Sequence, residues 1–143
     1  MTTSTYVNSL GAVVAWINQR SALVGPGRPL QKGAHFKHLR GAAVATYALM
    51  EELLTSGRSE DSPENPDQVA TLSAQVYGGT REAATAAAVA LCQELENGLT
   101  GVPVVVGDAV LKAVDDIQGP GWAPDGVTPR LLVQFSVRLA PNV

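Results

Sequence analysis

The stretch from Val69 to Gly98 most constrains the fold, because a strand pattern and a helix pattern meet across one short turn. Residues Val69–Tyr77 alternate between apolar and polar side chains, which is typical of a half-buried strand. The Gly78-Gly79 pair permits backbone angles that residues with a Cβ atom resist. The alanine-rich run Thr80–Asn97 then predicts a helix, with a threonine N-cap at its start and a glycine stop after it.

The apolar face of this predicted helix is made mostly of small side chains. The residues that share it recur at spacings of three and four: Ala84, Ala87, Ala88, Leu91 and Leu95. Alanines bury little area each, at roughly 25 cal/mol per Å² of apolar surface, so the helix needs a broad surface against it. That surface is either the sheet that contains Val69–Tyr77 or a neighbouring subunit.

Length and charge limit the class of protein. A chain of 143 residues predicts one domain, spanning 1–143, with one proper core. The formal net charge of −3 argues against binding nucleic acid mainly through phosphates, which needs a clustered excess of Lys and Arg. Cys92 is the only cysteine, so an internal disulfide and a multi-cysteine zinc site are excluded. Its place in the alanine-rich helix predicts a structural thiol.

Neither a signal peptide nor a membrane span is expected. The N-terminal residues MTTSTYVNSL lack a basic start and an apolar run. No segment approaches the roughly 20 apolar residues that cross a bilayer. We therefore expect a protein that is made in the cytoplasm and has no membrane partner.

The N-terminal region predicts a helix over Thr5–Gln19, capped by Ser4 or Thr5. Its apolar stripe comprises Tyr6, Leu10, Val13, Val14 and Ile17, with Trp16 at the edge. Gly11 interrupts the pattern and indicates a close contact at that position. The segment Val24–Leu30 contains two glycines and two prolines and predicts a loop.

Two later segments are ambiguous between strand and helix. His35–Arg40 fits a short strand, whereas Ala42–Leu54 fits either structure, and we favour a strand in its first half because a partner strand follows at Val69. Ala109–Gln118 is equally undecided by periodicity. Between these segments, Val102–Val106 is a short apolar run.

The segment Thr55–Gln68 is polar, acidic and broken by two prolines, so it predicts a flexible loop or arm. Its length exceeds that of most connections, which suggests a functional or disordered segment. Its acidic residues are Glu60, Asp61, Glu64 and Asp67. They lack the regular spacing and the glycine of a calcium loop, so a solvated acidic arm is the favoured interpretation.

The C-terminal part contains the clearest strand, Arg130–Leu139, in which apolar residues alternate strictly. It follows a turn-rich bend over Gly119–Pro129. The order of these elements predicts an α+β fold. We expect a mainly antiparallel sheet, with the N-terminal helix and the central alanine-rich helix packed on it.

Few residues of the sequence are candidates for catalytic chemistry. His35 and His38 would share a face on a helix but not on a strand, and no matching carboxylate lies near them in the sequence. Asp115 and Asp116 are adjacent and would face oppositely on a strand. Nucleophile elbows, phosphate loops and dinucleotide fingerprints are missing. We therefore expect no catalytic residue, no cofactor and no metal, and a protein that is not an enzyme.

Three stretches, taken in order, carry a resemblance to a known family: YVNSLGAVVAWIN, AQVYGGTREAATAAAVAL and GPGWAPDGVTPRLLVQFSVRLAP. Together they make the chain resemble the tail terminator, or tail completion, proteins of long-tailed bacteriophages, particularly those that infect actinobacteria. The resemblance implies a small α+β subunit that assembles as a hexameric ring. Such a ring caps the tail tube in the virion, ends tail elongation and joins the tail to the neck beneath the head.

The resemblance also implies partners rather than catalytic residues. The expected partners are further copies of the chain, the major tail tube protein and a neck or head-completion protein, while genomic DNA passes through the lumen without specific binding. Arg81 or Arg130 would meet the acidic arm of a neighbouring subunit, at Glu60, Asp61, Glu64 or Asp67. Another neck protein of similar size, or less favourably a small α+β enzyme or ligand-binding protein, is the alternative.

Overall fold

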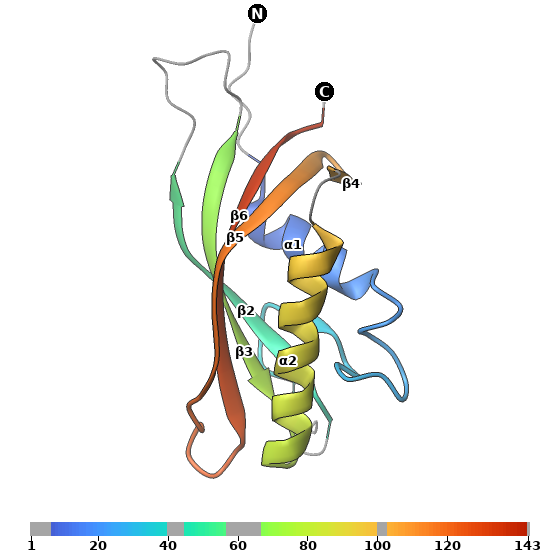
Figure 1. Ribbon diagram of the computed structural model, residues 1–143, viewed down its shortest axis with the longest axis vertical. Coiled ribbons are helices and arrows are strands. Elements are labelled where there is room, and N and C mark those ends of the chain that lie inside the picture. Colours follow the sequence, from blue (N-terminus) through green and yellow to red (C-terminus); the bar gives the residue numbers. More distant parts are fainter. Residues whose placement is uncertain (1–6, 40–44, 57–66, 100–102, 143) are drawn as a thin grey trace, which may run out of the picture.

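The structure is a computed structural model, and it describes residues 7–39, 45–56, 67–99 and 103–142 (Figure 1). Within these residues the chain forms two helices and one six-stranded sheet, which confirms the α+β class. The elements are α1 (Ser9–Asn18), β1 (Ala34–His35), β2 (Tyr47–Ser56), β3 (Gln68–Tyr77), α2 (Arg81–Gly98), β4 (Val104–Val106), β5 (Ala109–Trp122) and β6 (Arg130–Pro141).

The sheet is mixed and curled. Its strand order is β1-β2-β3-β6-β5-β4. The short strand β1 runs parallel to β2, whereas the other neighbouring strands pair in antiparallel fashion. The parallel pair departs from the sheet expected from the sequence. It forms because the loop after α1 returns the chain to the free side of β2 in the same direction, where Ala48 donates its N–H to the carbonyl of Gly33 at 2.9 Å.

The centre of the sheet is the long pairing of β3 with β6, from Gln68 opposite Leu139 to Tyr77 opposite Arg130. Both strands were predicted from their alternation, and both are confirmed. The apolar set of each strand points to one face and is buried: Ala70, Leu72, Ala74 and Val76 on β3, and Leu131, Val133, Phe135, Val137 and Leu139 on β6. A period of two therefore places one continuous apolar layer under the helices.

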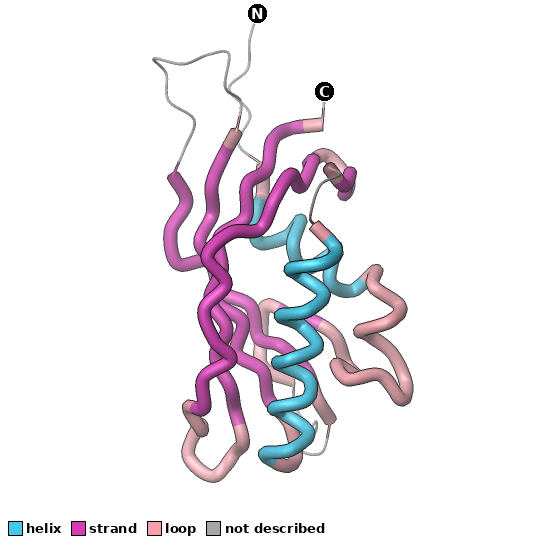
Figure 2. The backbone as a smooth tube through the Cα atoms, in the orientation of Figure 1, coloured by secondary structure: helices cyan, strands magenta, loops and turns pink. Residues whose placement is uncertain are grey.

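Helix α2 contacts β3, β5 and β6, and its alanine face belongs to the main core (Figure 2). The predicted cap is confirmed, because Thr80 Oγ1 accepts a hydrogen bond from the N–H of Ala83 at 3.1 Å. The glycine turn allows the close approach of strand and helix. A Cβ atom on Gly78 would lie 2.8 Å from the backbone nitrogen of Ala84, which real side chains do not tolerate.

Helix α1 begins later than the sequence suggests. Its N-cap is Asn8, whose side chain accepts a hydrogen bond from the N–H of Gly11 at 2.9 Å. Ser4 and Thr5, the predicted caps, lie outside the described residues. The close contact expected at Gly11 is with this cap, since a Cβ atom there would lie 2.7 Å from Asn8 Nδ2. Trp16 is fully buried instead of lying at the edge of the stripe.

The ambiguous segments both form strands. β2 covers Tyr47–Leu54 of the ambiguous segment, and Tyr47 pairs with Tyr77. Residues 42–44, at the start of the favoured first half, lie outside the described residues. A bulge between Glu52 and Leu54 shifts the alternation, and this shift made the spacing look helical. The connection between β2 and β3 is shorter than the predicted loop Thr55–Gln68. The first two residues of that segment belong to β2 and its last residue belongs to β3. Residues 57–66 lie outside the described part of the chain.

The second ambiguous segment, Ala109–Gln118, forms strand β5, which extends into the bend predicted over Gly119–Pro129. It runs to Trp122, beyond Gly119 and Pro120, and stays paired with β6 through three register shifts. The turn itself is short, because Asp125 and Thr128 exchange backbone hydrogen bonds of 3.0 and 2.9 Å. Gly126 supplies a positive φ of 61° between them. Glycine and proline therefore mark bulges inside this strand as well as the turn after it.

Neither described helix has the length and apolar character that crossing a membrane would require.

Candidate functional site

Both described helices lie on one side of the sheet, which leaves the other side without a helical cover (Figures 1 and 2). We call this side the helix-free face. Along its central strands it presents paired side chains from β3 and β6: Thr71, Ser73 and Gln75 opposite Ser136, Gln134 and Leu132. The described part of this face is therefore rich in hydroxyl and amide groups. The Oγ atoms of Thr71 and Ser136 lie 3.3 Å apart, within hydrogen-bonding distance.

An aromatic cluster closes one end of the helix-free face. The rings of Tyr47 and Tyr77 stack with centroids 5.2 Å apart, and the ring of His38 meets Tyr77 edge-on at the same distance. Leu49 is buried with them, and Leu39 packs against the group. The segment after β1 thus folds over the outer side of the sheet and forms a second, smaller core.

Arg130, one of the predicted interface residues, lies beside this cluster, with its guanidinium carbon 6.0 Å from the centroid of the Tyr77 ring. Its Nε donates to the carbonyl of Ala123 at 2.7 Å, and its NH1 donates to Gln75 Oε1 at 3.2 Å. Nearby, the Tyr77 hydroxyl donates to Asp125 Oδ2 at 3.0 Å. Burial raises the pKa of Tyr77, and the carboxylate of Asp125 adds to this effect while Arg130 opposes it. Arg130 therefore has partners within its own chain.

Arg81 and Asp67 lie elsewhere on the surface. The guanidinium of Arg81 sits over the exposed ring of Trp122, 4.4 Å from its centroid, at the start of α2. Asp67 Oδ1 accepts a hydrogen bond from Lys112 Nζ at 2.6 Å, which joins the beginning of β3 to β5. The other predicted interface residues, Glu60, Asp61 and Glu64, lie outside the described residues. The structure does not bring the six together.

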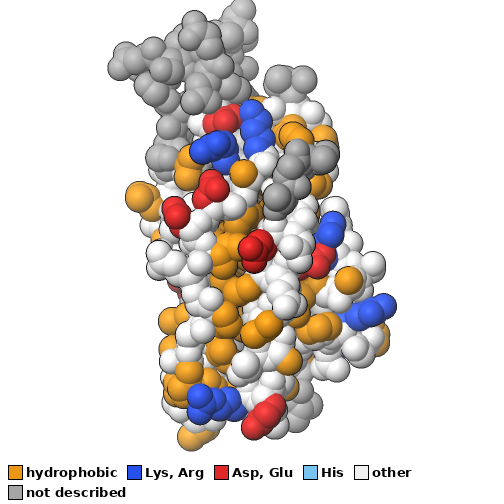
Figure 3. All heavy atoms as spheres, viewed as in Figure 1, with side chains coloured by type: hydrophobic (Ala, Val, Ile, Leu, Met, Phe, Trp, Pro, Cys, Tyr) orange, Lys and Arg blue, Asp and Glu red, His pale blue; other side chains and the backbone are white. Residues whose placement is uncertain are grey.

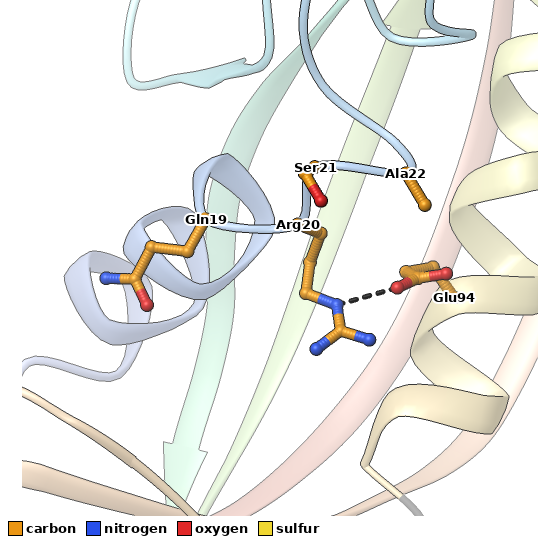
Figure 4. Close-up of a pocket in the computed structure, with 5 residues that line it drawn as sticks. All are labelled: Gln19, Arg20, Ser21, Ala22 and Glu94. Atoms are coloured by element: carbon orange, nitrogen blue, oxygen red, sulfur yellow. Dashed lines mark hydrogen bonds and ion pairs between the residues drawn. The ribbon is translucent and has the colours of Figure 1, made fainter.

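Two hollows of the described surface are open, and neither gathers catalytic groups. One, of about 200 Å³, lies between the end of α1 and α2, where Arg20 Nε contacts Glu94 Oε1 at 2.6 Å (Figure 4). Figure 4 shows Arg20 turned toward Glu94 and Gln19 turned away. Another, of about 440 Å³, lies between α1 and the turn from β4 to β5. An ion pair between two elements accounts for the first, so it is a packing feature.

The histidines and the cysteine take separate positions. His35 Nε2 contacts the carbonyl of Lys32, whereas His38 Nδ1 lies 3.2 Å from the Tyr47 hydroxyl. Among the described residues, groups of three or more His, Cys, Asp or Glu that could hold a metal are absent. Cys92 is half-buried on α2, and burial, with Glu96 nearby, raises the pKa of its thiol.

Sequence reasoning missed an exposed apolar feature on β2. Leu53 and Leu54 are 51% and 68% exposed, although both belong to a strand. The available signal was a pair of adjacent leucines beside two glutamates, in a segment too irregular for either periodicity. Such exposure on a strand near the edge of a sheet is a common mark of an interaction surface.

Comparison of the chain with known protein families and with curated proteins gives no match.

Proposed function

We propose that this protein is a structural subunit of a bacteriophage virion, a tail terminator that assembles as a hexameric ring at the head-proximal end of the tail. The observation that carries the proposal is the division of the sheet into one face packed under two helices and one broad polar face without a helix. The resemblance of three stretches of the sequence to tail terminator proteins supports the same interpretation. In this function the interfaces do the work, and no catalytic residue, cofactor or metal is required.

In the proposed ring, the helix-free face lines the lumen. DNA must pass through without being held, so the lumen should avoid clustered Lys and Arg that would bind phosphates. The hydroxyl and amide groups of Thr71, Ser73, Gln75 and Gln134 carry no charge, and Glu51, opposite Ser73, is acidic, so these groups suit the requirement. The helices then face outward, in a mainly antiparallel sheet with both helices on its outer side.

Two ends of the subunit remain for the proposed protein partners, the major tail tube protein and the neck protein. At one end of the subunit lie the hairpin turn 123–129 and the start of α2, and at the other lie the turn from β4 to β5 and the C-terminal end of β6 (Figure 1). A ring that caps a tube needs two distinct ends of this kind. One end would meet the last turn of the tube and the other the neck beneath the head.

A loss-of-function experiment in the phage tests the proposal. Phage that lacks this protein should make filled heads and tails of uncontrolled length that fail to join. Tails of normal length joined to heads would refute the assignment. Tails of normal length that stay separate from filled heads would instead place the protein elsewhere in the neck.

A further inference from the structure

Two exposed apolar surfaces lie near opposite edges of the sheet. The first, here the β2 ridge, comprises Glu51, Glu52, Leu53 and Leu54, four consecutive residues that are all exposed. Alternating side chains of a strand normally give at least every second residue a buried position. Four exposed residues in a row therefore mean that β2 extends past the helices here and shows both of its faces.

The backbone of the β2 ridge is also open on its outer side. β1 pairs only with Ala48 and Leu49 of β2, so within the described chain the edge from Met50 to Ser56 has no strand beside it. Proteins usually protect such an edge with charges, proline or bulges. The β2 edge has two of these features, the exposed glutamates and a bulge between Glu52 and Leu54, and the bulge also brings two leucines together on the surface.

The second surface, here the α2–β5 seam, follows the line where α2 lies against β5. It comprises Arg81, Val89, Cys92, Val114, Ile117 and Trp122. Val89 and Trp122 are 39% and 41% exposed, and the other apolar members are half-buried against the core. Figure 3 shows hydrophobic side chains gathered in a strip between α2 and the β5–β6 pair. The seam is thus a shallow apolar surface that is made by side chains.

The seam does not offer a strand edge for pairing, although β4 covers only Ala109–Leu111 of β5. Beyond that point β5 has three register shifts and contains Pro120. Asp115 and Asp116 are exposed on the same stretch. These features block the addition of a further strand. A partner would contact the side chains of the seam, and its own side chains would have to be apolar.

Position and charge indicate how the two surfaces match. The strand order places β2 and β5 toward opposite sides of the sheet, which suits a head-to-tail contact between copies. The ridge has two glutamates beside its leucines, and Arg81 lies at one end of the seam. Glu96 and Asp115 lie toward the other end and would repel the ridge. Glu51 points to the helix-free face, where it accepts a hydrogen bond from Gln75 Nε2 at 2.6 Å, whereas Glu52 stands opposite Leu72. Glu52 should therefore lie at the Arg81 end.

We propose that the β2 ridge of one copy docks on the α2–β5 seam of the next copy, with Leu53 and Leu54 against Val89 and Ile117. Glu52 then faces Arg81. This contact uses two different surfaces, so it repeats in one direction, and it forms a closed ring when the rotation between copies completes a full turn. The inference rests on the proposed function as a ring-forming subunit, and it names the surfaces that hold the ring together.

Cysteine cross-linking tests the contact directly. In a Cys92→Ser background, the double variant Leu54→Cys, Val89→Cys is treated with a short bismaleimide, with and without tail tubes. The expected result is a ladder of covalent oligomers that ends at the hexamer, whereas either single variant stays uncoupled. The matched control, Leu54→Cys with Val127→Cys, should give no ladder, because Val127 is fully exposed on the hairpin turn and belongs to neither surface.

Other results of the same experiment would overturn the inference in distinguishable ways. Covalent dimers from Leu54→Cys alone would show that two ridges meet across a two-fold axis. A hexamer by native mass spectrometry without any ladder would show that the ring uses other surfaces, which leaves the proposed function intact. A monomer under all conditions, with or without tubes, would remove both the inference and the proposed function.

Charge reversal gives a second test that does not depend on cross-linking. Glu52→Arg should weaken self-association by about tenfold or more, because like charges then face each other. Adding Arg81→Glu to that variant should restore a large part of the loss. Reversal at Arg28, an exposed cation outside both surfaces, is the control and should leave association unchanged. Failure of Arg81→Glu to restore association would contradict the proposed contact.

Discussion

The two faces of the β3–β6 pair have the same backbone and opposite roles. On one face, Leu72 and Phe135 stand opposite each other and are fully buried under the helices. On the other, Ser73 and Gln134 stand opposite each other without a helix above them. The two pairs are consecutive in the same ladder, and successive side chains of a strand point to opposite faces. The difference between the faces therefore comes from the side chains and not from the backbone. Stability is therefore concentrated on one face, and the other is free to serve an interaction.

The largest expected effect comes from removing an aromatic side chain from the covered face. Phe135→Ala should lower the free energy of unfolding by about 3–5 kcal/mol, because it leaves a cavity beneath α2. Its matched control on the helix-free face, Gln134→Ala, should change stability by only about 0.5 kcal/mol. Urea unfolding followed by circular dichroism measures both. Equal losses would contradict the division of roles between the faces.

A smaller loss is expected from adding volume to the alanine face of α2. Ala87 is fully buried against the sheet, so Ala87→Leu should cost about 1–3 kcal/mol through overpacking. Ala86 is exposed on the same helix, and Ala86→Leu should be nearly neutral in thermal unfolding. A neutral Ala87→Leu variant would mean that α2 does not press closely on the strands.

The aromatic cluster of the helix-free face should contribute less than the main core. Tyr77→Phe removes a hydrogen bond to Asp125 and should cost about 1 kcal/mol. Burial raises the pKa of Tyr77 in the folded state above its unfolded value of about 10. The folded state therefore holds this proton longer, and stability falls as the pH rises above 10 toward the folded pKa.

The Tyr77→Phe variant also tests this pH dependence of stability. Below pH 10 the wild type should be more stable than Tyr77→Phe by a constant amount. Above pH 10 the two unfolding free energies should converge, because only the wild type has this hydroxyl to titrate. A gap that widens with pH would show that the folded protein favours the tyrosinate.

The smallest effect concerns the reactivity of the thiol and leaves stability unchanged. Burial and the nearby Glu96 raise the pKa of Cys92, so little thiolate is present near neutral pH. Alkylation of Cys92 by iodoacetamide at pH 8 should be slow in the wild type. The control is a Cys92→Ser, Val127→Cys variant, whose cysteine takes a fully exposed position and should react faster. Faster alkylation at Cys92 than at the exposed cysteine would contradict the half-buried position and the raised pKa of the Cys92 thiol.

The regular elements of this fold were predictable from local pattern. β3, β6 and α2 have unbroken periods of two or of three and four, and their bounds in the structure agree with the prediction within one or two residues. β2 was only partly predictable, because its bulge at Glu52–Leu54 breaks the alternation. β5 was misjudged at its end for a related reason, since Gly119 and Pro120 usually mark turns and here lie within a paired strand.

The candidate surfaces were harder to predict from the sequence than the fold was. Exposure of Leu53 and Leu54 depends on where the helices end over the sheet, which no local pattern records. The bond between Asp67 and Lys112 joins residues 45 positions apart. Arg130 was predicted to meet the acidic arm of a neighbouring subunit, and in the structure it donates hydrogen bonds to Ala123 and Gln75 of its own chain. Such contacts are fixed by tertiary packing.

The central claim is that copies of this chain close into a ring on the end of a tail tube. Counting the copies on isolated tubes tests it most directly, by quantitative mass spectrometry of tubes incubated with the purified protein and by electron microscopy of labelled ends. The account predicts six copies per tube, all at one end. Binding along the whole tube, or no binding at any concentration, would contradict it.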